Sequence, residues 1–510
     1  MFIPVAEWLP DQPSYNNPGG NRAFNVIPGQ AWYEPMPSLV VKATGSTGRM
    51  LNFINARDNA NNNYTYCGDV SALYVQTGGS LTAVTKVSAT YAVANSDSWE
   101  FVQWGQTVLA TNGTDPIQQI SLGAANFVDL AGSPPKARHL AVIQNFVVTG
   151  NISDSATNVQ RVRWSALNNA GSWTPDPATL ADFQDLPGDG GWIQKIVGGE
   201  QGGYIFQERA IYQMNFVGSP LIFQFNKIQY NIGAYAPQGV VNYENLVYFL
   251  SADGFYKFDG TNITPIGRSK VDNTFFTDLD TTHTNNIRAA VWPKHKIVCW
   301  AYPGVGNNSG KPNHILIYSW AYDRWSRIDI PTTLDNGAVE CLGLSAVPGV
   351  TLEQLDAYCG SNIDSLVISL DDRSWTGGEL VFTAFVKGSL YYFNGNSMSA
   401  DVETTEMNPM QNLYQVQLNQ GNDNVKYLCQ LNEVYPILDG PSADAQTVQI
   451  ASRRQITDAV SYGPSIATNS AGFCQSRITN RFFRFRVKTD GSNYNFLQGV
   501  DINFVPAGLR

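Results

Sequence analysis

The chain has 510 residues, of which 43% are hydrophobic and 15% charged, and it carries a net charge of -10. A chain of this length is too long to fold around one compact core, so we expect two or more domains. The hydrophobic fraction is ordinary for a globular protein and excludes a disordered chain. The acidic balance argues against a protein that grips nucleic acid, because such a protein needs a basic surface for the phosphates. Abundant glycine with few charges favours an all-β fold of short strands and tight turns over long amphipathic helices.

Residues 1–50 are expected to form an extended N-terminal arm. Prolines recur along the segment, and proline lacks the backbone donor that a helix or a central strand requires. Aromatic residues such as Trp8, Phe24, Trp32 and Tyr33 are too apolar for a solvated tail. We therefore expect a strap that lies on another surface, which is either the chain's own domain or a neighbouring subunit. For an assembly we predict that the strap lies across a neighbouring subunit or an adjacent ring.

Residues 51–375 contain a loose repeat that predicts a β-propeller. Each unit has a short apolar strand, a turn and a second apolar strand with aromatic residues. The units lie at 72–87, 106–122, 144–151 with 159–167, 203–218, 245–267, 296–303 with 314–330, and 356–361 with 365–371. Their spacing of about 40 to 50 residues is that of a four-stranded blade. Seven blades are the best count, within a range of six to eight.

Turn dipeptides support hairpins inside these units. Asn112-Gly113, Asp253-Gly254 and Asp259-Gly260 separate apolar strands, which is the strongest short-range signal for a hairpin. The alternative is a pair of ordinary β-sandwiches, which also show short strands about every 8–12 residues. A spacing maintained over several units favours the propeller.

Residues 376–510 are expected to form a separate, small C-terminal β domain of the sandwich type. Its strand-like runs are 432–440, 446–455, 481–489 and 497–508, while 380–395 is a hairpin or a last blade. The chain's densest basic cluster lies here and comprises Arg477, Arg481, Arg484, Arg486 and Lys488. Because these residues alternate with phenylalanines, a strand with one solvated face is favoured over a track for phosphates. No nucleic-acid-binding residue is assigned.

The chain has six cysteines and none of them forms a C-x-x-C pair: Cys67, Cys299, Cys341, Cys359, Cys429 and Cys474. Buried free thiols are therefore favoured over disulfides or a metal site. The first residues lack the basic and apolar regions of a signal peptide, and no stretch approaches the roughly 18 apolar residues of a membrane span. We expect a protein made and assembled in a host cytoplasm, without a membrane-spanning segment.

Signals for catalysis are missing. The four histidines, His139, His283, His295 and His314, are scattered, and no nucleophile elbow or phosphate loop occurs. The run 251–258 begins like the Asp-box of sialidases but lacks its Thr-Trp ending. We therefore predict no enzyme, with no catalytic, cofactor-binding or metal-binding residues and no cofactor. Tryptophans such as Trp164, Trp173, Trp192, Trp292, Trp300, Trp320, Trp325 and Trp375 could stack on sugars, although packing between blades is favoured.

Two stretches in the middle of the chain, 192–219 and 232–275, resemble packaged-DNA stabilisation proteins, the tail hub or nozzle of short-tailed bacteriophages (podoviruses). The first stretch has the sequence WIQKIVGGEQGGYIFQERAIYQMNFVGS and ends in an aromatic-rich strand. The second stretch contains a strand, an Asp-Gly turn and a final Pro-Ile-Gly segment. Residues 5–40 resemble the N-terminal arm of such proteins, and 449–465 and 481–510 resemble their last domain. The resemblance covers almost the whole chain and transfers no site residue.

The resemblance implies a virion structural protein in the phage tail. It implies a homo-oligomeric ring, usually a hexamer, below the portal and the head-to-tail adaptor ring, which continues the DNA channel, helps to retain packaged DNA and attaches tail fibres, spikes or a needle. Double-stranded DNA would pass through the lumen without sequence-specific contacts during ejection. The alternative is a carbohydrate-binding or carbohydrate-cleaving propeller that acts as a receptor-binding tail component.

Overall fold

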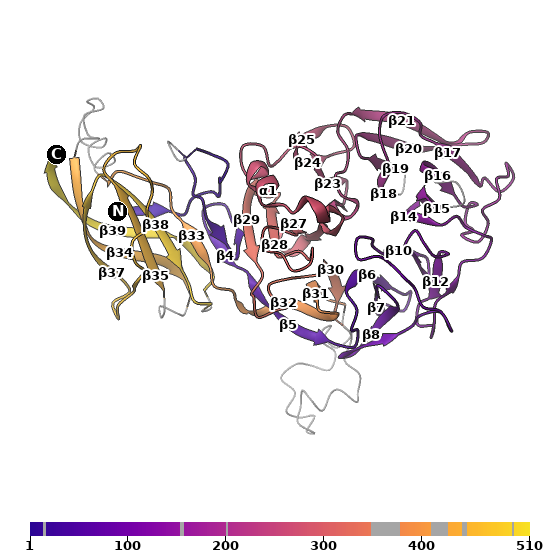
Figure 1. The fold of residues 1–510 in the computed structure, drawn as a ribbon, viewed down its shortest axis with the longest axis horizontal. Helices are drawn as coiled ribbons and strands as arrows, with labels where there is room; N and C mark the ends of the chain where they lie inside the picture. The colour runs from indigo at the N-terminus through magenta and orange to yellow at the C-terminus, as the bar shows by residue number, and fades with distance from the viewer. Residues whose placement is uncertain are drawn as a thin grey trace, which may run out of the picture.

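The computed structural model describes residues 1–13, 17–153, 158–199, 202–347, 378–409, 427–440, 446–491 and 494–509. Its regular structure consists mainly of β-strands. Helix is limited to short elements: α1 (Asp272–Asp278), η1 (Pro237–Gly239), η2 (Thr281–Asn286) and η3 (Pro293–His295). The chain is therefore all-β, as the composition predicts. Figure 1 shows a ring of small sheets and, beside it, a C-terminal unit that contains both chain ends.

Four-stranded antiparallel sheets make up the ring, and we number them in chain order (Figure 1). Sheet 1 contains β6 (Met50–Arg57), β7 (Asn63–Asp69), β8 (Leu73–Thr77) and β9 (Ser80–Ala83). Sheet 2 contains β10 (Glu100–Trp104), β11 (Thr107–Thr111), β12 (Gln118–Ser121) and β13 (Val128–Asp129). Sheet 3 contains β14 (Ala137–Ile143), β15 (Phe146–Ile152), β16 (Asn158–Trp164) and β17 (Asp182–Asp185). Sheet 4 contains β18 (Ile193–Val197), β19 (Gly202–Gln207), β20 (Ala210–Gly218) and β21 (Ile222–Tyr230).

The remaining ring sheets follow the same order of strands. Sheet 5 contains β22 (Val240–Tyr243), β23 (Leu246–Ser251), β24 (Gly254–Phe258) and β25 (Ile263–Pro265). Sheet 6 contains β26 (Arg288–Trp292), β27 (Ile297–Tyr302), β28 (His314–Ser319) and β29 (Arg324–Asp329). Sheet 7 contains β30 (Cys341–Ala346), β31 (Leu380–Val386), β32 (Ser389–Ser397) and β5 (Pro37–Ala43). This arrangement is β-propeller-like.

The first strands β6, β10, β14 and β18 lie toward the middle of the ring (Figure 1), and first strands of neighbouring sheets contact one another, for example β6 with β10 and with β30. The interval between successive first strands is shortest from Glu100 to Ala137 and longest from Ala137 to Ile193. It therefore varies around the spacing that the repeat predicts.

The predicted hairpins are confirmed where the structure describes them. Segment 72–87 forms β8 and β9, segment 106–122 forms β11 and β12, and segment 203–218 forms β19 and β20. Strands in the middle of a sheet are covered on both faces by neighbouring sheets, so their sequences are mainly apolar. β15 and β27, for example, are buried along their whole length. The segment 356–371 lies outside the described residues.

Sheet 7 is completed by a strand from the other end of the chain. β5 pairs antiparallel with β32, for example Val40 with Tyr392, so the N-terminal arm supplies the outer strand of the last sheet. The next residues enter sheet 1 at Met50, and this places the two ends of the ring side by side. Without β5, β32 would expose an unpaired edge.

The C-terminal unit consists of two sheets with a common apolar core. One sheet has the order β3 (Val26–Pro28), β4 (Tyr33–Pro35), β39 (Phe496–Leu509), β34 (Tyr427–Asp439) and β37 (Cys474–Asn480), with β1 (Phe2–Pro4) also on β39. The other has the order β2 (Ala23–Phe24), β33 (Asp401–Glu403), β38 (Phe482–Lys488), β35 (Thr447–Arg453) and β36 (Ile466–Ala467). The strands β34, β35, β38 and β39 confirm the four runs predicted in this region.

The ring and the C-terminal unit are joined by backbone hydrogen bonds and by packing. β2 pairs with β29 of sheet 6 on one side and with β33 on the other, so a single sheet runs from the ring into the C-terminal unit. Buried residues of both parts, including Trp300, Trp325, Val402 and Phe485, belong to one hydrophobic cluster. Such a continuous core resists movement of one part against the other.

Arg324, the first residue of β29, holds the arm against sheet 6. Its Nη1 donates to the carbonyl oxygens of Gly29 and Gln30, each at 2.9 Å, and its Nη2 donates to Ala6 O at 2.9 Å. The guanidinium also donates to the Tyr33 hydroxyl and lies 4.8 Å from the centre of that ring. Arg324 is 7% exposed, so these contacts are shielded from water.

One domain boundary expected from the sequence needs correction. Strands β31 and β32 follow residue 376 but pair with β30 and β5, so the last ring sheet ends at Ser397 and not at 375. The reason is that a sheet takes its outer strand from whichever segment lies next in space, which local sequence does not encode. The described strands of the arm, β1 to β5, pair within their own chain, so the chain's own domains are one surface on which the arm lies. A contact of the arm with a neighbouring subunit or adjacent ring stays a prediction.

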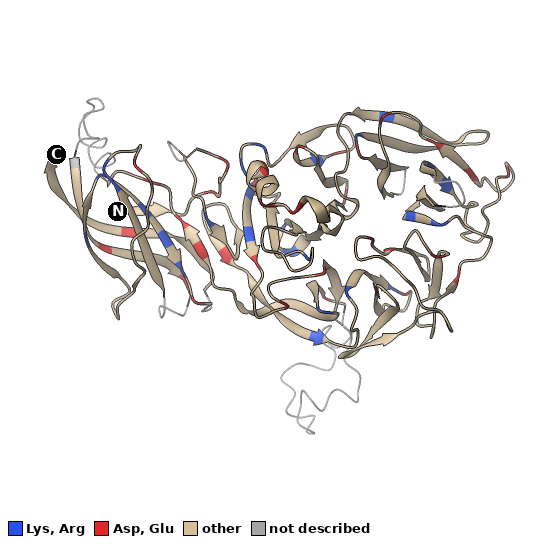
Figure 2. Ribbon diagram, in the orientation of Figure 1, with Lys and Arg blue, Asp and Glu red and all other residues tan. Residues whose placement is uncertain are grey.

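The basic cluster is also less exposed than expected. Arg484 is 1% exposed and lies 3.8 Å from Glu403, while Arg486 pairs with Asp401 on the adjacent strand β33. Figure 2 shows basic and acidic positions side by side on strands of the C-terminal unit. Arg477 is exposed as expected, whereas Arg484 and Arg486 face the carboxylates of strand β33.

Cysteines and membrane spans agree with the sequence where the structure describes them. Cys67, Cys299, Cys341 and Cys474 are buried free thiols, which confirms that prediction for them, and Cys429 is buried too. Cys359 lies outside the described residues. In the described ranges no helix has the length and apolar character to cross a membrane.

Candidate functional site

A polar cavity of about 280 Å³ lies where the first strands of sheets 2 to 6 begin. These strand starts converge on the middle of the ring, and the turns between second and third strands add further side chains. The lining residues are Ser96, Asp97, Ser98, Asn112, Arg138, His139, Asn151, Trp192, Gln194, Glu208, Tyr235, Pro237, Gln238, Thr284 and Asn285. We call this the central cavity.

Beside the cavity, a buried charged cluster ties three sheets together. Glu100 of β10 contacts His139 Nδ1 of β14 at 2.9 Å and Lys195 Nζ of β18 at 2.8 Å. Burial opposes the ionisation of Glu100, but Lys195 and His139 outweigh it and hold its pKa below the ordinary value. Lys195 also reaches Gln238 Oε1 at 3.4 Å, which extends the cluster to sheet 5.

Two further polar pairs line the cavity. Arg138 Nη1 lies 3.1 Å from Asp97 Oδ1, and Gln194 Nε2 donates to Glu208 Oε1 at 3.3 Å. Each contact uses only part of the hydrogen-bonding capacity of the two side chains, since a carboxylate accepts at two oxygens and a guanidinium carries five donors. The cavity therefore offers donors and acceptors to a polar ligand.

Trp192 is the large apolar surface of the cavity. It is 50% exposed, although it directly precedes the buried strand β18. Gly191 before it has φ +80°, and a Cβ at that position would lie 2.2 Å from Glu208 Oε2. Glycine at position 191 thus permits the close approach of Glu208 beside Trp192.

Charged side chains also connect the strand starts on the other side of the ring. Glu340, just before β30, accepts from the backbone N–H groups of Met50 and Gly388, each at 3.0 Å. Arg288 at the start of β26 donates to Asn285 O, and Asn285 lines the central cavity. Burial, followed by repulsion from Arg49, lowers the pKa of Arg288 to about 10.

Each of the four histidines has a carboxylate partner. Each lies within ion-pair distance of it: His139 of Glu100, His283 of Asp280, His295 of Glu34, and His314 of Asp329. Only His139 lines the central cavity. Within the described ranges, no group of three or more His, Cys, Asp or Glu residues is placed to hold a metal ion.

The tryptophans divide into two groups. Trp164, Trp173, Trp300 and Trp325 are fully buried, as predicted for packing residues, and Trp292 stacks on Phe382 between sheets 6 and 7. Trp192 is the exception, and the sequence signal that marks it is the glycine-rich run 188–191 directly before it. Trp375 lies outside the described residues.

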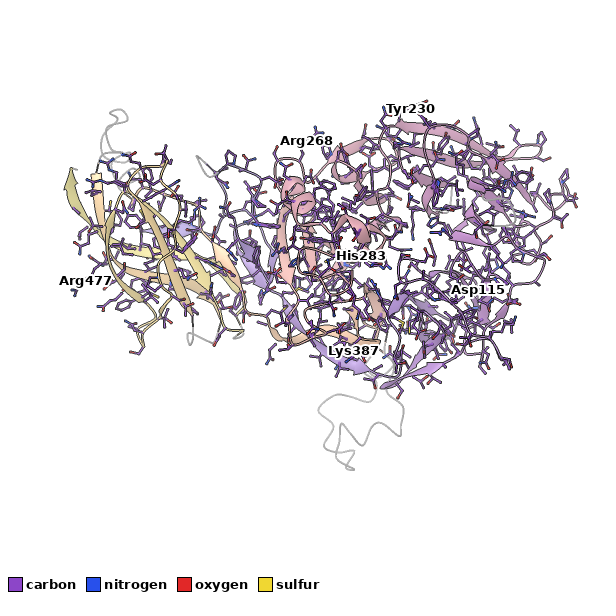
Figure 3. The ribbon with its side chains drawn as sticks, in the orientation of Figure 1. Asp115, Tyr230, Arg268, His283, Lys387 and Arg477 are labelled. Carbon is purple, nitrogen blue, oxygen red and sulfur yellow. The ribbon has the colours of Figure 1, made fainter. Side chains whose placement is uncertain are left out.

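Apart from Trp192, His139 and Asn112, the lining residues of the cavity were not singled out by the sequence. Asp97, Arg138, Gln194 and Glu208 come from four different connections or strand starts and form no local motif. Figure 3 shows, by contrast, Tyr230 at the outer edge of the ring and Arg477 on the C-terminal unit, both away from the middle of the ring.

Comparison with known proteins gives no family. No family model matches the chain, and no curated protein matches it. Among solved structures, the computationally designed Ika8 protein aligns with 70% of this chain and 99% of its own, at 10% identity and a TM-score of 0.38. Virginiamycin B lyase from Staphylococcus aureus aligns with 70% of this chain and 98% of its own, at 8% identity and a TM-score of 0.40. Similarities this weak assign no activity to the chain.

Proposed function

We propose that this chain is the tail hub, or nozzle, subunit of a short-tailed bacteriophage. In this proposal the ring sheets are the blades of a seven-bladed propeller, with an N-terminal arm and a C-terminal sandwich. Copies of the chain form a homo-oligomeric ring, a hexamer, below the head-to-tail adaptor. The ring continues the DNA channel, helps to retain the packaged genome and attaches distal tail parts.

The observation that carries the proposal is the fusion of the two parts into one body. The sheet that runs from β29 through β2 to β33, and the core that both parts share, join the described residues of the two parts directly. Arg324 holds the arm across the same junction. A subunit that must hold a pressurised genome and carry tail parts needs such a stiff connection, whereas a diffusible binding module does not.

The resemblance to tail hub proteins supports the same proposal. Its two central stretches follow structural elements, since 192–219 spans β18 to β20 of sheet 4 without β21, and 232–275 spans sheet 5 and the first part of α1. The C-terminal stretches contain β38, β39 and most of β35. A resemblance that follows structural units across the chain is what a shared architecture would produce.

The charge of the chain is compatible with a DNA conduit. Six copies of a chain with a net charge of -10 would carry 6 × (-10) = -60, and a negative lumen repels phosphates so that DNA slides once a plug leaves. Lys and Arg residues are interspersed with Asp and Glu over both parts of the chain (Figure 2), so the lumen needs a local excess of acid. We expect its wall to carry more Asp and Glu than Lys and Arg.

Electron microscopy of the purified full-length chain, alone and mixed with a portal–adaptor assembly, tests the proposal. We expect rings with one symmetry, six-fold in the simplest case, that dock end-on to the adaptor. Native mass spectrometry should give the matching oligomer mass. A chain that stays monomeric under both conditions would refute the hub, as would a ring whose lumen is lined mainly by Lys and Arg.

A further inference from the structure

We propose that the central cavity binds one uncharged pyranose sugar unit, a hexose or an N-acetylhexosamine, with its ring stacked on Trp192. This goes beyond the structural role proposed above and does not depend on it. A volume of about 280 Å³ is at the lower end of small-molecule sites, which span about 300–1,000 Å³. The cavity therefore suits a single sugar unit, for example the end of a surface glycan, and not a long oligosaccharide groove.

The lining has the two kinds of surface that a pyranose needs. A pyranose presents hydroxyl groups around its edge and C–H groups on its faces. Carboxylate, amide and guanidinium groups at Asp97, Arg138, Gln194 and Glu208 match the hydroxyls, because they offer both acceptors and donors. The half-exposed indole of Trp192 provides a flat apolar surface for the C–H face.

Charge distinguishes this ligand from an anion. Arg138 is already paired with Asp97 at 3.1 Å, and Glu208 adds a further carboxylate whose contact is with the neutral Gln194. The lining side chains thus carry no excess of positive charge. A phosphate or a carboxylate would meet the carboxylates of Asp97 and Glu208, whereas an uncharged polyol can donate to both.

The cavity is also held in shape before any ligand arrives. Glu100, His139 and Lys195 lock the starts of β10, β14 and β18 together, and these strands carry or adjoin Asp97, Arg138, Trp192 and Gln194. Preorganised polar groups do not need to be ordered on binding, which reduces the entropy cost. The side chains that face the sugar are thus carried by strands that buried ion pairs hold together.

Ligand-observed saturation-transfer NMR on the full-length chain tests the site. The probes are glucose, galactose, mannose, N-acetylglucosamine and N-acetylgalactosamine. Choline is the cationic comparison, and inorganic phosphate, observed by the line broadening of its phosphorus signal, is the anionic one. We expect at least one sugar to bind at millimolar concentrations, with its ring protons closest to the protein. Trp192→Ala should weaken this binding by about tenfold, which corresponds to about 1.4 kcal/mol, while Trp192→Phe should keep most of it.

Tyr230→Ala is the matched control, because Tyr230 is an exposed aromatic residue on the outer edge of the ring (Figure 3). This variant should bind the sugar as the unchanged protein does, and both Trp192 variants should keep its melting temperature. Binding of no sugar, equal loss in Tyr230→Ala and Trp192→Ala, or Trp192-dependent binding of phosphate or choline alone would each overturn the proposal. The measurement does not require the chain to form an oligomeric ring. A failure to bind sugar would therefore leave the proposed hub function untouched, and a failure of the hub proposal would leave the sugar site untouched.

Discussion

Replacing Arg324 with alanine removes the side chain that holds the N-terminal arm to sheet 6. The substitution removes one donor from the carbonyl oxygens of Ala6, Gly29 and Gln30 and from the Tyr33 hydroxyl. Ala6 O keeps the Tyr33 hydroxyl as a donor at 2.9 Å and Gln30 is exposed, so Gly29 O is the buried group most affected. A buried polar group without a partner costs about 1–3 kcal/mol, and water that enters the space left by the side chain offsets part of the total. We therefore expect the free energy of unfolding to fall by about 3–5 kcal/mol.

The corresponding change in melting temperature follows from the chain length. The entropy of unfolding is about 2.1 cal/mol/K per residue, which gives about 1.1 kcal/mol/K for 510 residues that unfold together. The expected loss then lowers the melting temperature by about 3–5 °C in calorimetry. Hydrogen exchange of the arm should accelerate more than that of sheets 2 to 4, because the lost contacts belong to the arm.

Two variants make the experiment specific. Arg324→Lys keeps the charge, but a single ammonium group cannot serve all four acceptors, so its loss should be intermediate, about 1–3 kcal/mol. Arg477→Ala removes an exposed arginine from β37 and should change stability by less than about 0.5 kcal/mol. A melting temperature of Arg324→Ala within about 1 °C of that of Arg477→Ala would refute the argument that Arg324 fastens the arm.

Three further predictions concern the ring. Burial raises the pKa of Asp272 from 3.8 to about 6. Between these two pH values the folded state binds more protons than the unfolded state, so the free energy of unfolding should fall as pH rises. Asp272→Asn should flatten that part of the profile of melting temperature against pH. Gly68→Ala would place a Cβ 2.5 Å from the buried Trp99 ring, and we expect a loss of about 1–3 kcal/mol by denaturant unfolding. The control is Gly79→Ala, whose Cβ would meet only Lys42 O at 3.7 Å, and it should cost no more than about 0.5 kcal/mol. Burial raises the pKa of the Cys299 thiol far above its ordinary value, so a thiol reagent should modify Cys299 only after unfolding, and rapid labelling of the native protein would contradict its placement.

The sequence by itself determined the local structure of this protein. Apolar runs bounded by turn dipeptides predicted the hairpins of sheets 1 to 6, because strand alternation and the positive φ of turn glycines depend on neighbouring residues alone; Gly113 and Gly260 have φ +79° and +92°. The same local signals predicted β34, β35, β38 and β39 and the burial of most tryptophans.

Only the tertiary structure decided which distant segments meet. β5 completes sheet 7 with β32, β2 joins β29 to β33, and Arg484 lies buried against Glu403 although its strand reads as half solvated. The central cavity has the same origin, since Asp97, Arg138, Trp192 and Glu208 are brought together by closure of the ring. Pairing between segments hundreds of residues apart depends on the shapes of completed sheets and on the charges that they bury, and no local pattern carries that information.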